Sequence, residues 1–393
     1  MVEKIRVVML GSYPLDTAQI CGGVQAAYVY LVKGLAQTDN LDLHIFTLRP
    51  SDYPVTDSVK QTNLTLHFLP PYPRFERLRN YRTYQKFVNR NLAQIKPDLI
   101  HAQDAGADAL VALRSGFPTV ITVHGIRWED GKHYSSWIKR LRISFDSLLT
   151  ERFVVRQARY LIAISSYVTS YFKDMLKPEA EVFYVPNAID ERYFNLDKSP
   201  DEQIVLFAGR VIPRKRVMDL VQAFSQVLMQ VPSAKLHIAG EISTEPAYVD
   251  AIRKWIHESH LGEHISFLGS LSEEAILHEF AGCSILALPS AQETAPMVIA
   301  QAMAAGKPVV ATRIGGVGEM VGDNSRRGFL VNVGDIDGLA AALTRLLQYP
   351  DLQEKMGQCG KAFAQEHYHI NRVARRTNEV YRHIVTKEQK TNV

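Results

Sequence analysis

Two cationic side chains, Arg210 and Lys215, follow an apolar run at residues 204–208 that has the length of a buried strand. An Arg guanidinium binds two anionic oxygens at once and a Lys ammonium acts as a point charge, so the pair suits a diphosphate group. A solvated basic turn before a helix would have the same composition. What lies opposite the two cations decides between these interpretations.

The segment ALPSAQETAPMVIAQAMAAGKPVVAT, residues 287–312, is the most informative stretch. A short apolar run and a polar turn lead into a helical pattern over 296–305, and a second apolar run follows over 308–311. Strand, loop, helix and strand in so short a stretch form a βαβ unit. This unit places the loop at 290–295 at the carboxyl edge of a parallel sheet, where ligands bind.

Within this loop, Thr294 is the predicted N-cap of the helix and Pro296 fits the first helical turn. The amides of Met297 and Val298 would then point free N–H groups at an anion. Glu293 lies at the mouth of this site, and Gln301, two turns further on, projects to nearly the same side. The alternative interpretation is a buried helix that happens to follow an acid.

Two more candidates lie at predicted strand ends. His124 ends an apolar strand over 119–123, so its imidazole could hydrogen-bond a substrate hydroxyl or carry a proton. Gly22 and Gly23 precede a helical pattern and would allow a phosphate or a sugar close to the backbone. A structural histidine and an ordinary glycine turn are the alternatives. His101 also ends a strand and is interpreted as structural.

The elements that would position these residues alternate as strand and helix along both halves of the chain. In the first half, the apolar patterns predict strands over 5–10, 43–48, 64–69, 98–102, 119–123, 160–164 and 182–185 and helices over 25–35, 74–95 and within 132–157. After a polar linker at 191–202, the second half has predicted strands over 204–208, 235–239, 265–268, 285–288, 308–311 and 328–331. Its predicted helices run from the basic run at 214–216 to about 230 and over 247–259, 272–280, 335–347 and 351–384, besides the one at 296–305. Both halves therefore repeat one plan, a doubly wound parallel sheet.

Length and composition fit a soluble protein of two domains. The chain has 393 residues, 46% hydrophobic and 22% charged, which is more than one core usually holds. A formal charge of +4 is too small to predict nucleic-acid binding. Cys21, Cys283 and Cys359 have no paired spacing, so neither disulfides nor a thiolate metal site is predicted. The N-terminus lacks a cleavage site and no apolar stretch has bilayer-spanning length, so we expect a cytoplasmic protein.

The acidic pair Asp335 and Asp337 has the form of a metal site. It opens a predicted helix after Gly334, where capping and the helix dipole explain both acids. No metal site is therefore predicted from it.

In their order along nearly the whole chain, these pieces resemble the retaining glycosyltransferases of family 4 (glycosyl transferases group 1), which have the GT-B fold. The motifs that carry the resemblance are GGVQ, VITVHG, AISSYV, VPNAID, FAGRVIPRK, ISFLGSL, the segment at 287–312 with IGGVGEMV, and GFLVNVGDIDGLAAAL. GGV or GRVIPRK alone would be a weak signal, whereas the ordered set is specific. The resemblance implies an α/β fold of two facing Rossmann-like domains with a cleft between them.

The same resemblance implies the division of the chain. Residues 1–190 would bind the acceptor and residues 191–370 the nucleotide sugar, while residues 371–393 would form a helix that packs back toward the N-terminal domain.

The reaction implied by the resemblance is hexosyl transfer from a nucleotide diphosphate sugar to an acceptor hydroxyl, with retention of configuration and with no metal or other cofactor. The expected catalytic residues are His124 near the reacting carbon, Glu293 at the donor sugar hydroxyls, and Arg210 and Lys215 at the leaving diphosphate, where charge develops. The other expected donor contacts are Gly22, Gly23, Leu268, Leu271, Met297, Val298 and Gln301.

Two positions depart from the family pattern. Where the family has a second Glu that binds the donor ribose, this chain has Gln301, which lacks the two-hydroxyl acceptance of a carboxylate. Pro296 stands where Gly is frequent and removes one N–H from the anion site. The nucleotide is therefore not predicted, and a non-catalytic nucleotide-sugar-binding protein stays open as an alternative. A disaccharide synthase and a phosphorylase on the same fold are the enzymatic alternatives.

Basic residues are concentrated in the first half, where residues 1–190 contain 23 Lys and Arg against 18 Asp and Glu. On the predicted helix at 74–95, Arg79, Arg82, Lys86 and Arg90 share one face. We hypothesise that they contact an anionic membrane surface, at roughly 1 kcal/mol for each basic group. Such a contact would suit a glycan or lipid-linked acceptor in cell-surface polysaccharide or glycolipid synthesis. A solvated helix face is the alternative.

Overall fold

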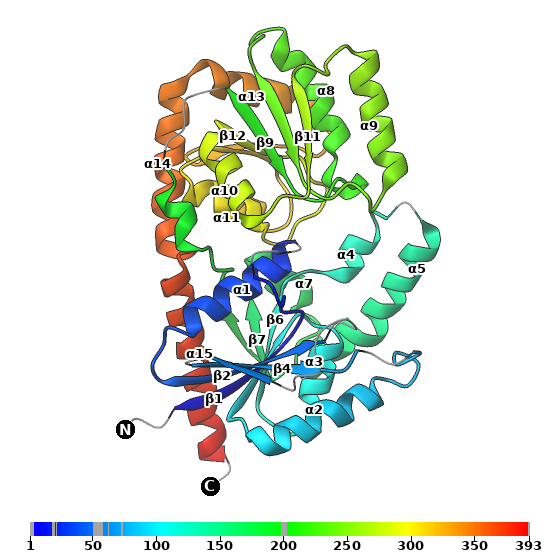
Figure 1. Cartoon of the computed structure of the whole chain (residues 1–393), viewed down its shortest axis with the longest axis vertical. Helices are drawn as coiled ribbons and strands as arrows, with labels where there is room; N and C mark the ends of the chain where they lie inside the picture. Colours follow the sequence, from blue (N-terminus) through cyan, green and yellow to red (C-terminus); the bar gives the residue numbers. More distant parts are fainter. Residues whose placement is uncertain are drawn as a thin grey trace.

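The computed structural model describes residues 4–17, 20, 22–49, 58–61, 63–71, 74–134, 136–197 and 203–391. Cys21 lies outside this part of the chain. The described residues form two α/β domains, one above the other in Figure 1. Each domain is a mainly parallel sheet covered by helices, so the prediction of two facing Rossmann-like domains is confirmed.

The N-terminal sheet has eight strands in the order β3-β4-β2-β1-β5-β6-β7-β8. The pairings are parallel except for the short edge strand β3, which runs antiparallel to β4 and was not predicted. The strands are β1 (Ile5–Leu10), β2 (Leu41–Leu48), β3 (Ser58–Gln61), β4 (Leu64–Leu69), β5 (Leu99–Gln103), β6 (Thr119–Val123), β7 (Tyr160–Ala163) and β8 (Glu181–Tyr184). The strand order reverses at β1, which pairs with both β2 and β5. The loop that leaves β1 therefore opens at a switch point, the usual place for a ligand.

The C-terminal sheet has six parallel strands in the order β11-β10-β9-β12-β13-β14. They are β9 (Ile204–Ala208), β10 (Lys235–Ala239), β11 (Ile265–Gly269), β12 (Ile285–Leu288), β13 (Val309–Thr312) and β14 (Gly328–Val331). The switch point is β9, which pairs with β10 and β12. The loops after β9 and β12 carry the predicted cations and Glu293, so the topology brings these two loops to one edge.

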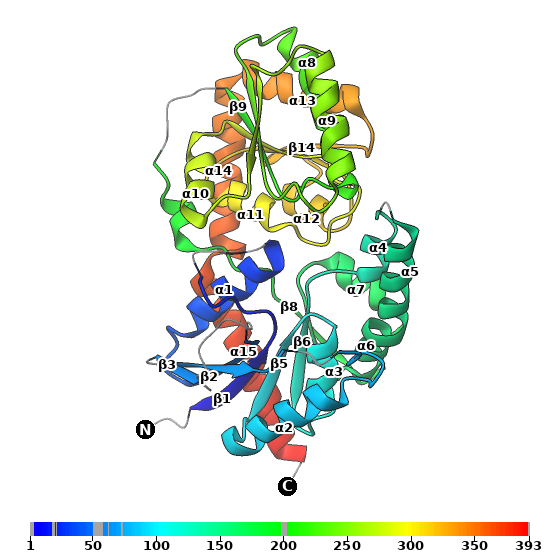
Figure 2. The same cartoon turned by 45° about the vertical axis from the view of Figure 1, so that its right-hand side comes forward.

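Helices of the N-terminal domain surround its sheet (Figure 2). They are α1 (Gly23–Leu35), α2 (Arg82–Ile95), α3 (Ala107–Leu113), α4 (Arg127–Gly131), α5 (Trp137–Asp146), the π-helical turn η1 (Ser147–Glu151), α6 (Arg152–Gln157) and α7 (Ser166–Phe172).

The helix predicted over 74–95 begins only at Arg82, so that prediction was wrong for its first eight positions. Tyr81 has a left-handed backbone (φ 57°), and the Glu76 carboxylate accepts hydrogen bonds from the amides of Thr83 (2.6 Å) and Tyr84 (2.9 Å). This carboxylate satisfies the first helical amides from outside and fixes the start of α2. Arg79 consequently lies in the preceding turn and not on the helix.

The remaining helices belong to the second half of the chain. They are the 3₁₀ turns η2 (Glu191–Asn195) and η3 (Pro213–Lys215), then α8 (Val217–Leu228), α9 (Pro246–Glu258), α10 (Glu273–Gly282), α11 (Met297–Ala304), α12 (Val317–Val321), α13 (Ile336–Gln348), α14 (Pro350–His367) and α15 (Ile370–Thr391). As predicted, Asp335 caps α13, accepting from the Gly338 amide at 2.9 Å. The linker predicted at 191–202 begins with η2.

Helix α15 leaves the C-terminal domain and runs down the N-terminal domain (Figures 1 and 2). It packs on α1 at Gly34, where an added Cβ would come within 2.9 Å of Ala374 and Ile370. At the crossing, the Ile189 amide donates to the Tyr368 carbonyl (2.8 Å) and the Ile370 amide to the Ile189 carbonyl (3.2 Å). The chain therefore passes between the domains twice, and the two passages are hydrogen-bonded to each other.

Candidate functional site

The loop between β12 and α11 holds Glu293 in a buried position, with 6% of the residue exposed. Thr312 Oγ1 donates to the Ser290 carbonyl (2.5 Å) and fixes the start of the loop. The glycines of IGGVGEMV pack directly on the loop backbone, because a Cβ at Gly315 or Gly316 would overlap the carbonyls of Glu293 or Thr294. Only glycine fits at these two positions.

Helix α11 begins at Met297, with Pro296 at the N-cap and no side-chain cap. The prediction of Thr294 as the N-cap was wrong, because the extended backbone of Pro296 (ψ 121°) delays the helix. The amides of Met297 and Val298 are the first of the helix and have no acceptor inside it. They remain the expected anion-facing groups.

Lys215 and Arg214 reach Glu293 from η3. Lys215 Nζ donates to Glu293 Oε1, and Arg214 Nη1 lies 3.7 Å from Oε2. Arg214 Nη1 also donates to the Gln292 carbonyl at 2.5 Å. Burial opposes ionisation of Glu293, but the charges of Lys215 and Arg214 outweigh it and hold the pKa of this carboxyl below its usual value. The free protein thus keeps a charged Glu293 neutralised by two cations.

Arg210 lies elsewhere, in an exposed position directly after β9. It makes no ion pair with any residue in the described part of the chain, so the structure unites Lys215 but not Arg210 with Glu293. The missed residue is Arg214, the first member of the basic run Arg214-Lys215-Arg216. The 3₁₀ turn η3 after Ile212 points the Arg214 side chain toward Glu293. The spacing of residues in the sequence does not reveal this turn.

Asp130 approaches this group from the other domain. It lies on α4, and its Oδ1 is 3.5 Å from Arg214 Nη1. Burial raises the pKa of Asp130, and Arg214 opposes the shift. We call Asp130, Arg214, Lys215 and Glu293 the charged cluster. Asp130 was not identified from the sequence, since an acid on a five-residue helix carries no local signal.

His124 is buried at the end of β6, and its Nε2 lies 2.9 Å from Gln103 Oε1. Gln103 Nε2 is 3.1 Å from His101 Nε2, and His101 Nδ1 is 2.6 Å from the Tyr381 hydroxyl of α15. Burial lowers the pKa of both histidines, that of His101 to about 3, so both are neutral. His124 Nδ1 is buried and has no hydrogen-bond partner among the described residues. His101 is structural, as predicted, and His124 keeps one ring nitrogen unused.

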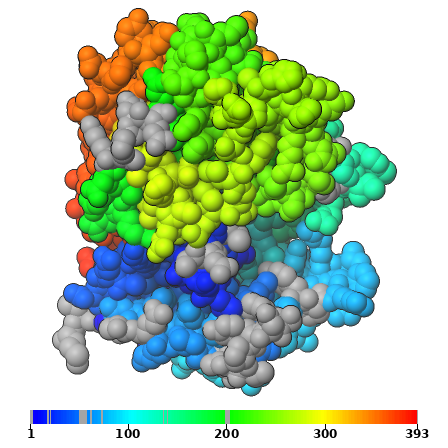
Figure 3. All heavy atoms as spheres, turned by 45° about the horizontal axis from the view of Figure 1, so that its top comes forward, coloured from blue at the N-terminus to red at the C-terminus, as the bar shows by residue number. Residues whose placement is uncertain are grey.

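The glycine pair faces α11 across the domain boundary. Gly22 has φ 86° and open space where a Cβ would lie, and a Cβ at Gly23 would be 3.3 Å from Met297 Cγ. Figure 3 shows blue atoms of the N-terminal domain directly below yellow atoms of the C-terminal domain. The starts of α1 and α11 therefore meet at the domain boundary.

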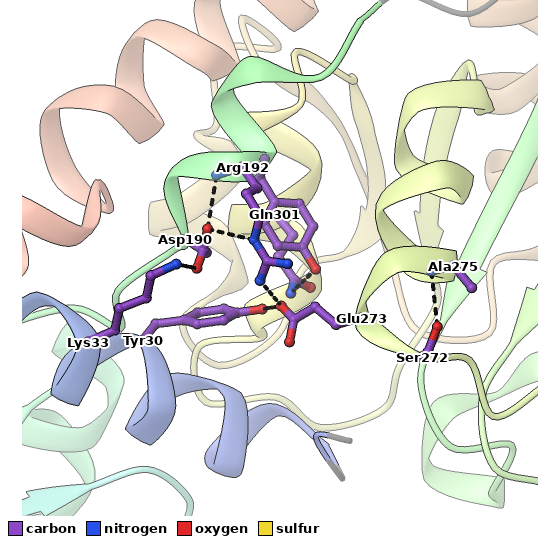
Figure 4. Close-up of polar contacts among 9 residues, drawn as sticks. Tyr30, Lys33, Asp190, Arg192, Ser272, Glu273, Ala275 and Gln301 are labelled. Carbon is purple, nitrogen blue, oxygen red and sulfur yellow. Dashed lines mark hydrogen bonds and ion pairs between the residues drawn. The ribbon is translucent and has the colours of Figure 1, made fainter. Parts of the chain in front are cut away.

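Gln301 lies on the same helix, and its Nε2 donates to the buried Tyr193 hydroxyl at 2.9 Å (Figure 4). Leu268 and Leu271 flank the end of β11, where the Gly240 amide donates to the Gly269 carbonyl at 2.7 Å. Their place at the same sheet edge agrees with a base-binding role, which stays a prediction.

The basic residues Arg79, Arg82, Lys86 and Arg90 are exposed. In both ribbon views, α2 lies at the end of the N-terminal domain that faces away from the C-terminal domain (Figures 1 and 2). The structure therefore does not bring these residues into the cleft.

Among the residues that the structure describes, no group of three or more His, Cys, Asp or Glu side chains could hold a metal ion. No helix in the described part of the chain is long and apolar enough to cross a membrane.

Comparison with known families adds independent evidence. The family model described as Glycosyltransferase Family 4 matches residues 21–193, and the model described as Glycosyl transferases group 1 matches residues 189–363. The chain belongs to the family 4 glycosyltransferases. The two matches cover the two domains of this glycosyltransferase in turn.

Among relatives of this glycosyltransferase, the N-acetyl-alpha-D-glucosaminyl L-malate synthase of Bacillus anthracis is 29% identical over 58% of the chain and 61% of its own length. The alignment thus spans less than two thirds of that relative. An uncharacterized glycosyltransferase of Methanocaldococcus jannaschii is 26% identical over 88% of the chain and 90% of its own length.

Solved structures share the fold. Sucrose-phosphate synthase from Thermosynechococcus elongatus has a TM-score of 0.81 at 21% identity and covers 98% of this chain and 100% of its own. Anabaena HepE, solved with UDP and glucose, has a TM-score of 0.73 at 19% identity and covers 96% of this chain and 99% of its own. At such identities the likeness establishes the GT-B fold alone.

Proposed function

We propose that this family 4 glycosyltransferase moves a hexosyl group from a nucleoside diphosphate sugar to an acceptor hydroxyl with retention of configuration. The observation that carries the proposal is the convergence of Lys215, Arg214 and the start of α11 around Glu293, opposite Gly23 of the other domain. The presence of UDP and glucose in the HepE structure supports a donor of this class.

In the proposed reaction, the acceptor oxygen forms a bond to the anomeric carbon while the bond from that carbon to the diphosphate breaks. The acceptor proton leaves with the diphosphate. Negative charge grows on the departing oxygen, where Lys215, Arg214 and the amides of Met297 and Val298 would stabilise it. These groups supply the charge that a metal ion supplies in other transferases, so we expect activity in the presence of a chelator.

Glu293 would change partners when the donor binds. In the free protein both of its oxygens face cations. A diphosphate competes for those cations and leaves the carboxylate free to accept hydrogen bonds from donor sugar hydroxyls. Neutral His124, with Nδ1 unused, would accept or donate a further hydrogen bond to the sugar.

A calorimetric panel of UDP, GDP, ADP, dTDP and their sugar conjugates, measured with EDTA present, tests this function. We expect saturable binding of one nucleotide series. Binding by none of them would overturn the proposal. With the donor known, the coupling constant of the anomeric proton in the product reports retention or inversion.

For the acceptor, we infer a lipid-linked molecule or glycan of the cell surface, reached at the cytoplasmic face of an anionic membrane. The support is an exposed apolar surface on α5 and η1, where Trp137 is 69% and Leu149 72% exposed. Arg77 pairs with Asp146 (3.0 Å) and ties the turn containing exposed Phe75 and Leu78 to the end of α5. Apolar side chains beside the basic residues of α2 form the kind of surface that enters a membrane interface.

Vesicle flotation tests this location. Binding to phosphatidylglycerol vesicles should fall when Trp137 and Ile138 are changed to Ala, and also when Arg79, Arg82, Lys86 and Arg90 are changed to Gln. Met229→Ala, which removes an exposed apolar side chain of the C-terminal domain, is the matched control. No binding of the unaltered protein would end the membrane proposal and leave the transferase proposal untouched.

A further inference from the structure

The start of α7 in the N-terminal domain touches the C-terminal domain at α12. Figure 2 shows α7 below α12, which belongs to the segment IGGVGEMV. Both carboxylate oxygens of Glu319 on α12 accept a hydrogen bond from the amide of Ser166, at 3.0 Å and 3.2 Å. Ser166 is the first residue of α7, so this carboxylate caps a helix of the other domain.

The residue that would ordinarily cap α7 is not used. Ser165 is the N-cap, and a serine at this position usually accepts a hydrogen bond from an amide of the first helical turn. Here its hydroxyl is buried and has no hydrogen-bond partner among the described residues. It is packed on Gly316, where an added Cβ would lie 3.0 Å from Ser165 Oγ. Ser165 is therefore free to cap α7 only when the two domains move apart.

The same contact extends to the backbone of the Glu293 loop through two glycines. A Cβ at Gly315 would lie 1.7 Å from the Glu293 carbonyl oxygen. A Cβ at Gly316 would lie 2.1 Å from the Thr294 carbonyl oxygen and 2.9 Å from Ser165 Cβ. The glycine turn at 315–316 thus lies between the start of α7 on one side and the Glu293 loop on the other.

Tyr167 adds a direct contact between α7 and this loop. Its hydroxyl accepts a hydrogen bond from Gln292 Nε2 at 3.3 Å, and its ring lies 3.3 Å from the position of a Cβ at Gly315. Gln292 precedes Glu293 and is 7% exposed. The loop that presents Glu293 is therefore supported from the N-terminal domain as well as from its own.

We propose that Glu319 is a positioning residue, which keeps α7 against the glycine turn and so fixes the Glu293 loop only while the two domains touch. Its role at the donor rests on the proposed function, because the contact of Glu293 with the donor sugar belongs to that proposal. Separation of the domains returns the cap of α7 to Ser165 and removes the support of the loop on this side. The sugar site is therefore complete only when the domains come together.

Two single changes remove the contact from opposite sides. Glu319→Ala removes the acceptor. Ser166→Pro removes the donor, because proline has no amide hydrogen and is well tolerated as the first residue of a helix. Ser165 already has the extended backbone that a following proline requires (φ −155°, ψ 158°).

Hydrogen exchange of the unliganded protein, followed in peptides that cover 164–172 and 290–296, tests the support of the loop. We expect Glu319→Ala to speed exchange of the amides at 290–296 by about fivefold, the size of one net hydrogen bond. Ser166→Pro should do the same, and the double variant should show no further increase. Glu319→Gln, which keeps an acceptor oxygen, should retain most of the protection. Glu263→Ala, at an exposed glutamate of the same domain, is the control.

Calorimetry with UDP, GDP, ADP, dTDP and their sugar conjugates connects the contact with the donor. A nucleoside diphosphate uses Lys215 and Arg214 of η3, so Glu319→Ala should change its affinity by less than about twofold. A nucleoside diphosphate sugar also uses Glu293, so its affinity should fall by about fivefold in the same variant.

Faster exchange at 164–172 without a change at 290–296 would mean that Glu319 only caps α7, and would overturn the proposal. Additive effects of Glu319→Ala and Ser166→Pro on the loop would overturn it as well, because the two changes remove one contact. Linked exchange of the two peptides in a protein that binds no nucleotide sugar would retain the support of the loop and reject the proposed function separately.

Discussion

The charged cluster and the contact of Tyr30 and Arg192 with Glu273 both join the two domains, but they compensate buried carboxylates in different ways. Glu293 faces two cations, and its pKa is lowered. Glu273 faces one hydroxyl and one half-exposed guanidinium, and burial raises its pKa although Tyr30 and Arg192 oppose the shift. In the first region, an anionic ligand can replace Glu293 as the partner of Lys215 and Arg214. The second region holds its carboxylate with a hydrogen bond from the buried Tyr30 hydroxyl.

This difference indicates separate roles at one boundary. Ions in the charged cluster can change partners without a change of backbone, because a diphosphate offers Lys215 and Arg214 the same interaction as Glu293 does. The hydrogen bond from Tyr30 to Glu273 has no such substitute, since Tyr30 is 2% and Glu273 7% exposed. We therefore expect the charged cluster to take part in donor binding, and the contact between Tyr30 and Glu273 to hold α1 against α10.

The largest effect should follow removal of a cation from the charged cluster. Lys215→Ala should weaken nucleoside diphosphate binding by about 10- to 100-fold, because a charge-assisted contact is lost and Glu293 keeps only Arg214. Calorimetry with the preferred nucleotide measures the loss. Lys254→Ala, which removes an exposed helical pair with Glu258, is the control.

Arg210→Ala tests whether the two predicted cations contribute equally to nucleotide binding. The exposed position of Arg210 predicts a smaller loss than that of Lys215→Ala. An equal loss would mean that Arg210 moves into the site and contacts the donor when the donor binds.

Asp130→Asn should act in the opposite direction. Removing the carboxylate that competes for Arg214 should tighten nucleotide binding by about two- to fivefold, the size expected for one partly exposed ion pair. Glu129→Gln, which changes the neighbouring acid that pairs with Lys132, is the matched control. Weaker binding by Asp130→Asn would assign the carboxylate a direct role at the donor instead.

The smallest effect concerns pH. Because the folded pKa of Glu273 is raised above the ordinary 4.5, the folded protein holds a proton that the unfolded chain releases, and stability falls as pH rises through the folded pKa. Glu293 has the opposite sign: its lowered pKa gives stability above pH 4.5 that is lost as pH falls through the folded value.

Unfolding temperatures of wild type, Glu273→Gln and Glu293→Gln between pH 3 and pH 8 would separate the two regions. Glu273→Gln should flatten the alkaline side of the profile, and Glu293→Gln the acid side. Identical pH profiles for the two variants would contradict the opposite pKa shifts of Glu273 and Glu293.

The fold was accessible from the sequence because apolar runs and helical patterns alternate regularly, as in β12 and α11. The predicted helix over 74–95 was wrong because its cap is Glu76, which comes before the helix and acts through a left-handed turn at Tyr81. The helical spacing of apolar residues continues through such a turn, so the sequence pattern does not reveal it.

For the site, the sequence predicted that Lys215 and Glu293 lie at one sheet edge, since both follow strand ends, and the structure places them in direct contact. It could not separate Arg210 from Arg214, because the choice depends on a 3₁₀ turn of three residues. The roles of Asp130, Tyr30 and Glu273 could not be predicted from the sequence for another reason. Their partners lie in the other domain, and single-sequence patterns carry no information about such contacts.

The position of α15 has a consequence for how the protein is made. The N-terminal domain is built from two separate parts of the chain, because Tyr381 and Ala374 of its last helix are buried against His101 and Gly34. Domains usually fold as they leave the ribosome, the first one earliest. Here the first domain has all eight of its strands once β8 is made, but it lacks α15 until that helix has been translated, after β14 has completed the sheet of the second domain.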